Sequence, residues 1–185
     1  MDYYNNHMKY AALLRAINVG GNNKLPMKDL ARIFTDAGCR GVETYIQSGN
    51  VVFTASAKIL KKLPETIAAA IESEFGFRAP IIIRSHEELA AIINANPFLK
   101  SNEAEKTLHV AFLASGVQND AIAKLDPQRC APDRFHVIGK DMYLHMASGL
   151  GRTKLTNAWI DSKLETISTV RNWNTVLKLH EMTRS

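Results

Sequence analysis

The chain has 185 residues, of which 46% are hydrophobic and 22% are charged. This ordinary balance excludes a mainly disordered protein, and the length allows one compact unit or two closely packed subdomains. The six histidines and two cysteines show no metal-ligand spacing, so we expect no metal site and no cofactor.

A formal net charge of +5 admits nucleic acid or another polyanion as a partner. Lys and Arg outnumber Asp and Glu by 12 to 9 in residues 1–100 and by 11 to 9 in residues 101–185, so the excess is spread evenly. The closest approach to a basic run is Lys58, Lys61 and Lys62, which we interpret as the solvated flank of a helix.

Cys39 and Cys130 have no neighbouring cysteine, which favours a reduced, cytoplasmic protein. No apolar stretch approaches the roughly 20 residues of a membrane span, so no membrane association is expected. The start of the chain lacks a secretory signal pattern, and residues 1–8 are expected to form a loose extension.

Apolar spacing in the first half predicts alternating strands and helices. The expected elements are a strand at 10–17, a helix at 27–37, a hairpin of strands 42–46 and 50–54, a helix at 59–75, a strand at 80–84 and a helix from 85 to 93. Ser85 followed by Glu88 has the spacing of a capping box, which begins the last of these helices.

The second half repeats this order. The expected elements are a strand at 108–113, a helix at 119–125, a hairpin of strands 134–138 and 142–146, a helix at 154–164, a strand at 166–170 and a helix at 174–182. We therefore predict an α+β protein with two tandem ferredoxin-like (βαββαβ) subdomains, each followed by a helix. The expected boundaries are 9–96 for the N-terminal subdomain, 97–106 for a connector and 107–185 for the C-terminal subdomain.

Three polar loops carry the candidate chemistry. Residues 18–26 (NVGGNNKLP) place two glycines and a lysine before a helix, which suits an anion because glycines expose backbone N–H groups. Residues 148–154 (SGLGRTK) resemble them in kind, and residues 171–175 (RNWNT) offer an arginine, two amides and an indole ring. If the loops converge, they form a basic pocket for a small anionic or nucleotide-like ligand. The candidate ligand-binding residues are Arg15, Asn18, Gly20, Gly21, Asn22, Lys24, Gly151, Arg152, Lys154, Arg171, Asn172, Trp173 and Asn174.

Each loop also has a purely structural interpretation. The glycines can serve turns alone, Arg15 can pair with a carboxylate, Asn174 or Thr175 can cap a helix, and Trp173 can be a hydrophobic staple. Neither glycine loop satisfies a Walker or dinucleotide-binding motif.

Several separated motifs together resemble a bacterial family known as domain of unknown function 1697. They are residues 14–21 (LRAINVGG), 24–27 (KLPM), 47–53 (QSGNVVF), 151–157 (GRTKLTN) and 169–176 (TVRNWNTV). The resemblance implies a cytosolic bacterial α+β protein of two subdomains with no established activity. Glu165 stands where that family usually has a glycine, which concerns a turn rather than the pocket.

The binding of a small anionic ligand is the favoured hypothesis. A nucleic-acid-binding module is the first alternative, although the sequence lacks an RNA-recognition aromatic motif. A phosphate-handling hydrolase or transferase is the second, and the sequence identifies no acid, base or nucleophile for it. The sequence predicts no oligomeric state.

Overall fold

The computed structural model describes residues 8–101 and 103–184. The described chain divides into two compact units. Unit 1 contains residues 8–89 and 179–184, and unit 2 contains residues 90–178. Of the extension expected at residues 1–8, all but the exposed Met8 lies outside the described residues.

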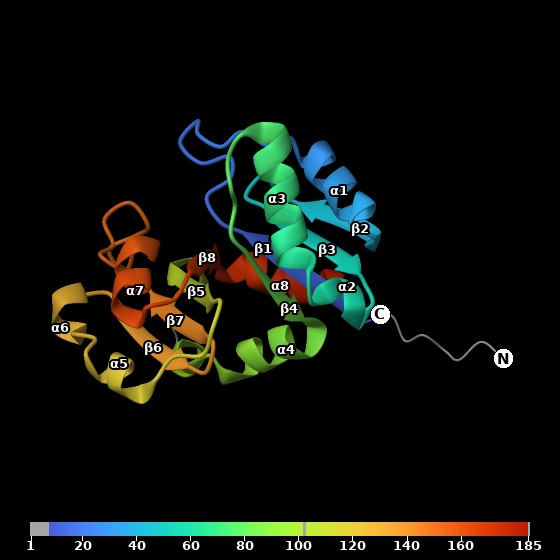
Figure 1. Ribbon diagram of the computed structural model, residues 1–185. Coiled ribbons are helices and arrows are strands. Elements are labelled where there is room, and N and C mark those ends of the chain that lie inside the picture. Colours follow the sequence, from blue (N-terminus) through green and yellow to red (C-terminus); the bar gives the residue numbers. More distant parts are fainter. Residues whose placement is uncertain (1–7, 102, 185) are drawn as a thin grey trace. The chain divides into compact units, whose positions relative to one another are not determined.

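Unit 1 is built on a four-stranded antiparallel sheet of order β2-β3-β1-β4 (Figure 1). Its elements are β1 (Lys9–Leu14), α1 (Met27–Asp36), β2 (Arg40–Tyr45), β3 (Asn50–Thr54), α2 (Ala57–Leu60), α3 (Leu63–Phe75), β4 (Ile81–Ser85) and the start of α4 (His86–Ala95).

The core of unit 1 lies between this sheet and helices α1 and α3. Leu30, Ile33 and Phe34 recur at helical spacing on α1 and are buried, and Phe34 packs against Phe53 of β3 with ring centroids 5.3 Å apart. Strand β1 is hydrogen-bonded on both sides, which explains why its sequence is apolar on both faces.

The largest differences between the expected elements of unit 1 and the structure concern β1 and the helix expected at 59–75. Strand β1 ends at Leu14 instead of residue 17, because Ala16 adopts a left-handed conformation with φ of 57°. The expected helix at 59–75 is two helices, α2 and α3, which are separated at Lys61 and Lys62. The capping box is confirmed, since the Ser85 N–H donates to the Glu88 carboxylate at 2.8 Å and the Glu88 N–H donates to Ser85 Oγ at 3.2 Å.

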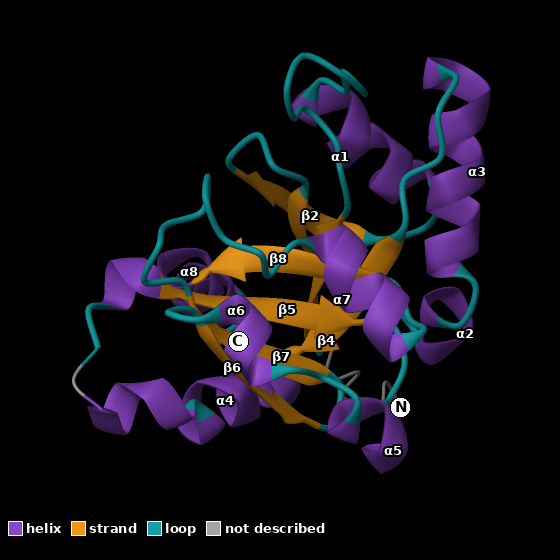
Figure 2. Ribbon diagram, turned by 90° about the vertical axis from the view of Figure 1, so that its left-hand side faces the viewer, coloured by secondary structure: helices purple, strands orange, loops and turns teal. Residues whose placement is uncertain are grey.

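Unit 2 has a second antiparallel sheet of order β6-β7-β5-β8, with α7 lying across one face of it (Figure 2). Its elements are the end of α4, η1 (Pro97–Ser101), η2 (Glu105–Thr107), β5 (Leu108–Leu113), α5 (Asn119–Ala123), α6 (Pro127–Cys130), β6 (Arg134–Ile138), β7 (Asp141–His145), α7 (Asn157–Leu164), β8 (Ser168–Asn172) and the start of α8 (Trp173–Met182).

The core of unit 2 combines β5, β7 and α7, where Ala111, Leu113, Leu144 and Ile160 are buried together. Helix α7 begins three residues later than the sequence predicts and β8 begins two residues later, while the strand at 108–113 is confirmed. Both units mix helices with an antiparallel sheet, so the α+β class is confirmed.

The two units repeat one hydrogen-bonding register. Arg84 of β4 lies opposite Ala11 of β1, and Arg171 of β8 lies opposite Val110 of β5. Each arginine side chain is buried, and each donates to the carbonyl of the residue before it. The two units therefore also share a buried arginine at the equivalent position of the sheet. The sequence pattern indicated only that the order of the elements is repeated.

Candidate functional site

The glycine pair of the first predicted site lies at the tip of a small hairpin. Gly20 and Gly21 have φ of 59° and 79°, and the Asn22 N–H donates to the Val19 carbonyl at 3.1 Å. Two central residues with positive φ are typical of a type I′ turn, which glycine adopts without steric cost. Residues 15–26, called loop A below, thus project an exposed tip from the end of β1.

Asn18 holds loop A closed. Its side-chain amide N–H₂ donates to the Leu25 carbonyl and to the Gln47 carbonyl, each at 2.9 Å, and its Oδ1 accepts from the Leu25 N–H at 2.8 Å. Asn18 itself has φ of 54°, a conformation that asparagine tolerates better than most residues. Its amide is therefore committed to the loop and to the neighbouring hairpin turn.

That hairpin turn, between β2 and β3, packs directly under loop A. The Leu14 N–H donates to the Gly49 carbonyl at 2.8 Å. A Cβ atom on Gly49 would stand 2.8 Å from Leu14 Cβ and 2.9 Å from Ile17 Cδ1, closer than van der Waals contact allows. The Gln-Ser-Gly segment of the sequence is thus explained by close packing against the start of loop A.

The outer side of loop A carries its remaining predicted residues. Gly20, Gly21, Asn22 and Lys24 are exposed, and Lys24 Nζ has no hydrogen-bond or ion-pair partner among the described residues. Arg15 is half-buried, and its backbone N–H donates to the Pro80 carbonyl at 2.9 Å. Loop A therefore has an inner side that Asn18 fixes and an outer side on which Lys24 is exposed.

The second predicted loop, residues 147–156 and called loop B below, is pinned by a buried carboxylate. Asp133 Oδ1 accepts from the Ser148 N–H at 2.8 Å and from Ser148 Oγ at 2.5 Å. Burial opposes the charged form of Asp133, but the hydrogen bonds from Ser148, together with hydrogen bonding from Thr153 and the nearby His145, lower its pKa. The Arg152 N–H closes a turn onto the Gly149 carbonyl at 3.0 Å.

Loop B ends like loop A. Lys24 and Lys154 are exposed, while Leu25 and Leu155, which follow them, are each 1% exposed and lie two residues before α1 and α7. Arg152 is also exposed, and neither it nor Lys154 has a hydrogen-bond or ion-pair partner for its side chain in the described chain. In both loops a buried leucine anchors the segment and a lysine faces outward.

The third predicted cluster is mainly structural. Arg171 is 7% exposed, its Nη1 donates to Thr169 Oγ1 at 2.8 Å and to the Val170 carbonyl at 3.0 Å, and burial lowers its pKa to about 10. Trp173 is 1% exposed, so its ring offers no stacking surface. The helix cap is Asn172, whose Oδ1 accepts from the Thr175 N–H at 2.8 Å, and not Asn174 or Thr175.

Two residues of this cluster, Asn172 and Asn174, are exposed. Sequence reasoning also missed Asp133, which lies 15 residues before the serine that it binds. No local pattern marks that pairing.

The half-buried Glu103 connects a second group that sequence reasoning missed. His145 Nε2 lies 3.1 Å from Glu103 Oε2, Arg134 pairs with Glu103 Oε1, and Arg134 Nη2 lies 3.2 Å from His145 Nδ1. Both imidazole nitrogens are thus occupied, which does not suit a general base. Among the described residues no three His, Cys, Asp or Glu side chains are grouped to hold a metal, and no helix is long and apolar enough to cross a membrane.

Comparisons with known proteins agree with the fold. The model of a protein family described as "Protein of unknown function (DUF1697)" matches residues 8–143. A conserved bacterial protein from Streptococcus pneumoniae has a similar solved structure, with a TM-score of 0.69 and 23% sequence identity, covering 96% of this chain and 99% of that chain. At this identity the likeness concerns the fold. No curated protein matches.

Proposed function

This chain belongs to the DUF1697 family, whose function is unknown, and we propose that it binds small anionic ligands, of phosphate or nucleotide type, at loop A of unit 1 and, separately, at loop B of unit 2. The ligand-facing groups are the exposed tip of loop A with Lys24, and Arg152 with Lys154 on loop B. Because the sequence resembles a bacterial, cytosolic family, we also propose that this binding takes place in the bacterial cytoplasm.

The main support for the proposal is that the hydrogen bonds of the Asn18 side chain hold loop A in one conformation. Three hydrogen bonds of 2.8 to 2.9 Å fix the inner side of the loop, while Gly20, Gly21, Asn22 and Lys24 on its outer side are exposed. A fixed loop binds a ligand with a smaller loss of conformational entropy than a mobile one. Exposed glycine N–H groups beside a lysine are suited to phosphate oxygens.

Thermal unfolding in the presence of tripolyphosphate, ATP or inorganic phosphate tests the proposal. A ligand at 100 times its dissociation constant stabilises the folded state by about 2.7 kcal/mol, which is a readily measured shift in Tm. Lys24→Ala and Arg152→Ala should each reduce the shift. Matched controls are Lys28→Ala on α1 and Lys163→Ala on α7, which remove the same charge outside the loops and should leave the shift unchanged.

We also propose that residues 9–96 and 107–185 are ferredoxin-like subdomains, each built on one of the two sheets, with a connector at 97–106. The strand orders β2-β3-β1-β4 and β6-β7-β5-β8, both fully antiparallel, support this. The nucleic-acid alternative has less support, because Phe53, an aromatic residue on a strand, is fully buried. No acid–base pair in the described chain supports the enzymatic alternative.

A further inference from the structure

A groove separates the end of α1 from α2 and the start of α3, at the opposite end of α1 from loop A. Its deeper section has a volume of about 410 Å³ and is lined by Ala37, Ser56, Lys58, Ile59, Lys62, Leu63 and Thr66. It adjoins a smaller cavity of about 160 Å³ between α1 and α3, with which it shares Ala37 and Thr66. Ligand pockets commonly have volumes of about 300 to 1,000 Å³.

The floor of the groove exists because the chain breaks between α2 and α3. Pro64 occupies the first turn of α3, a position that favours the start of a new helix. Gly38 lets α2 approach, since a Cβ atom there would lie 3.0 Å from Ile59 Cδ1. The half-buried Ile59 and Ala37 therefore form the apolar surface of the groove, and the buried Leu63 packs beneath them.

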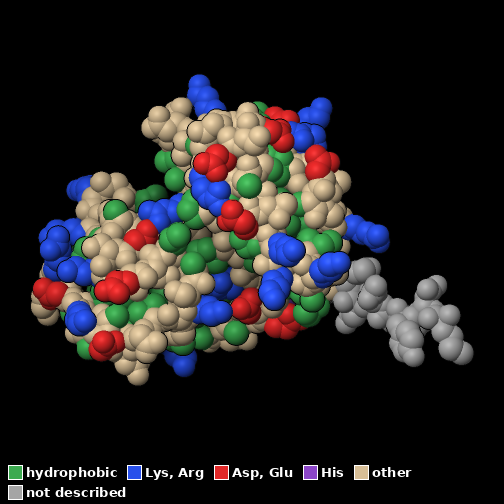
Figure 3. All heavy atoms as spheres, viewed as in Figure 1, with side chains coloured by type: hydrophobic (Ala, Val, Ile, Leu, Met, Phe, Trp, Pro, Cys, Tyr) green, Lys and Arg blue, Asp and Glu red, His purple; other side chains and the backbone are tan. Residues whose placement is uncertain are grey.

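The rim of the deeper section is basic. Lys58 and Lys62 are exposed and have no hydrogen-bond or ion-pair partner for their ammonium groups among the described residues. The N-cap of α3 is Lys62 itself, and no side chain caps this helix end, so its N-terminal partial charge adds to the two ammonium groups. Figure 3 shows Lys and Arg side chains gathered over α2 and the start of α3.

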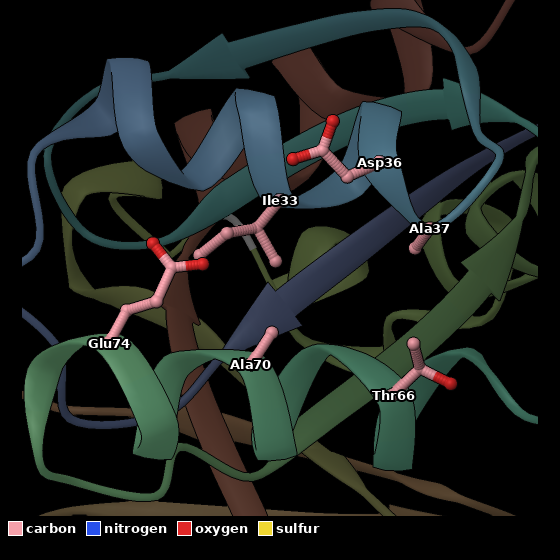
Figure 4. A pocket seen from close by; sticks show the side chains of 6 residues that line it. All are labelled: Ile33, Asp36, Ala37, Thr66, Ala70 and Glu74. Atoms are coloured by element: carbon pink, nitrogen blue, oxygen red, sulfur yellow. The ribbon is translucent and has the colours of Figure 1, made fainter.

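The acidic groups of the smaller cavity are already paired. Asp36 and Glu74 lie on either side of Ile33 and Ala70 (Figure 4), and Arg32 forms ion pairs with both carboxylates. The last carbonyls of α1 are also used, since those of Ile33 and Thr35 accept from Ala37 and Gly38. These groups therefore oppose an anion in the deeper section only weakly.

From an apolar floor beneath an uncompensated basic rim, we propose that this groove binds an amphipathic anion, namely a carboxylate carried on a short hydrocarbon chain. The carboxylate lies between Lys58 and Lys62 at the start of α3, and the hydrocarbon covers Ile59 and Ala37. The site shares no residue with loops A and B, so it is separate from the proposed phosphate-type site.

Titration of the full chain with octanoate, followed by calorimetry and by amide chemical shifts, tests this site. We expect saturable binding, with shifts centred on Ile59, Leu63 and Thr66. Acetate, which lacks the hydrocarbon, and 1-octanol, which lacks the charge, should both bind at least about tenfold more weakly, because each loses one of the two contacts. Octanoate binding should weaken as salt is added.

Matched lysine variants separate a specific site from general basicity. Lys58→Ala and Lys62→Ala should each weaken octanoate binding about fivefold, the effect of one partly exposed ion pair. Lys61→Ala removes the same charge from the same break but does not line the groove, and Lys62→Arg keeps the charge, so both should bind octanoate normally. Lys24→Ala should also bind normally, which distinguishes this site from loop A.

Three results would overturn the inference. They are non-saturable octanoate binding, an affinity for 1-octanol equal to that for octanoate, and equal losses in Lys61→Ala and Lys62→Ala. Amide shifts centred outside the groove would also contradict it.

Discussion

Glycine is required at different positions of this chain for different physical reasons, although several of these glycines have a positive φ. A Cβ atom on Gly20, where φ is 59°, would meet nothing within 4 Å, whereas Gly49, where φ is 78°, lies against Leu14 and Ile17. The first residue serves only a turn, and the second serves both a turn and a close packing contact. Alanine substitution at Gly20 therefore tests backbone strain alone, whereas substitution at Gly49 tests backbone strain together with steric overlap.

Gly49→Ala should destabilise the protein more than Gly20→Ala. Both variants incur the cost of a left-handed alanine, roughly 1 to 2 kcal/mol, and Gly49→Ala adds overpacking that typically costs about 1 to 3 kcal/mol. Urea unfolding of the two variants measures the difference. Equal losses of unfolding free energy would show that the contact with Leu14 and Ile17 is not tight.

Glu165 illustrates a departure from the family that the structure explains. It is the C-cap of α7 and adopts the left-handed conformation, with φ of 50° and ψ of 40°. This is the position at which helices commonly end in glycine, because glycine adopts this conformation without a Cβ penalty. The glycine usual in the family would fit the same turn.

Glu165→Gly is therefore expected to raise the free energy of unfolding by about 1 kcal/mol. Thermal or urea unfolding measures the gain. Glu181→Gly, within α8, is a control of the same chemical change and should destabilise by about 1 kcal/mol. A Glu165→Gly variant less stable than the parent would mean that the Glu165 side chain itself stabilises the turn.

At the scale of elements, the end of α8 is fastened to the start of α4 and to β1 within unit 1. The rings of His86 and His180 stack with centroids 4.5 Å apart, His86 Nδ1 lies 3.1 Å from Thr183 Oγ1, and Lys9 Nζ donates to the Arg184 carbonyl at 3.1 Å. Burial first, then the charges of His86 and Arg184, lower the pKa of His180. The environment of His180 thus favours its neutral form.

Stability should consequently fall as pH drops through and below 6.5, the ordinary pKa of histidine. Below that value the unfolded chain binds a proton that the folded state takes up only at lower pH, so protons favour unfolding. Buried His109, whose pKa is also lowered by burial, contributes in the same direction.

Urea unfolding at pH 7.5 and pH 5.5 measures this dependence. His180→Phe, which keeps a flat ring but cannot be protonated, should reduce the loss between the two pH values. His136→Phe, at an exposed position of β6, is the matched control and should leave the loss unchanged. An equal pH dependence in the parent and in His180→Phe would contradict a role for the pair.

Local patterns predicted most elements, and distant contacts account for what they did not predict. The capping box at Ser85 and the strand at 108–113 depend on neighbouring residues, so the sequence shows them directly. Ile59, Leu63 and Ile67 continue one helical period across the break at Lys62, which hides it. The bond from Asn18 to Gln47 spans 29 residues, and no local rule could predict it.

Some residues of the candidate site could be predicted from the sequence and others could not, again because only local preferences are visible in a sequence. The sequence identified the glycine turn and the outward lysines of both loops, because glycine and lysine have strong local preferences. It could not distinguish a buried arginine from an exposed one, so Arg171 and Trp173 were included as ligand groups although both are buried. The carboxylate of Asp133 escaped notice because its serine partner lies far along the chain.

At the scale of the whole molecule, the motifs of the sequence serve two purposes in each loop. Asn18, Gly49 and Leu25 hold loop A in place, and Ser148 and Leu155 do the same for loop B. The side chains of other motif residues, Lys24 and Arg152 among them, form no hydrogen bond or ion pair with the described residues. These are the side chains that the proposed anion binding would use.

Titration of the full chain with tripolyphosphate, observed through backbone amide chemical shifts, tests the proposed anion binding most directly. We predict saturable shifts at Gly20, Gly21 and Lys24 of loop A and at Arg152 and Lys154 of loop B. Lys24→Ala should abolish those of loop A, and Lys28→Ala should leave them unchanged. Shifts absent from both loops, or shifts in them that grow linearly without saturation, would contradict the proposal.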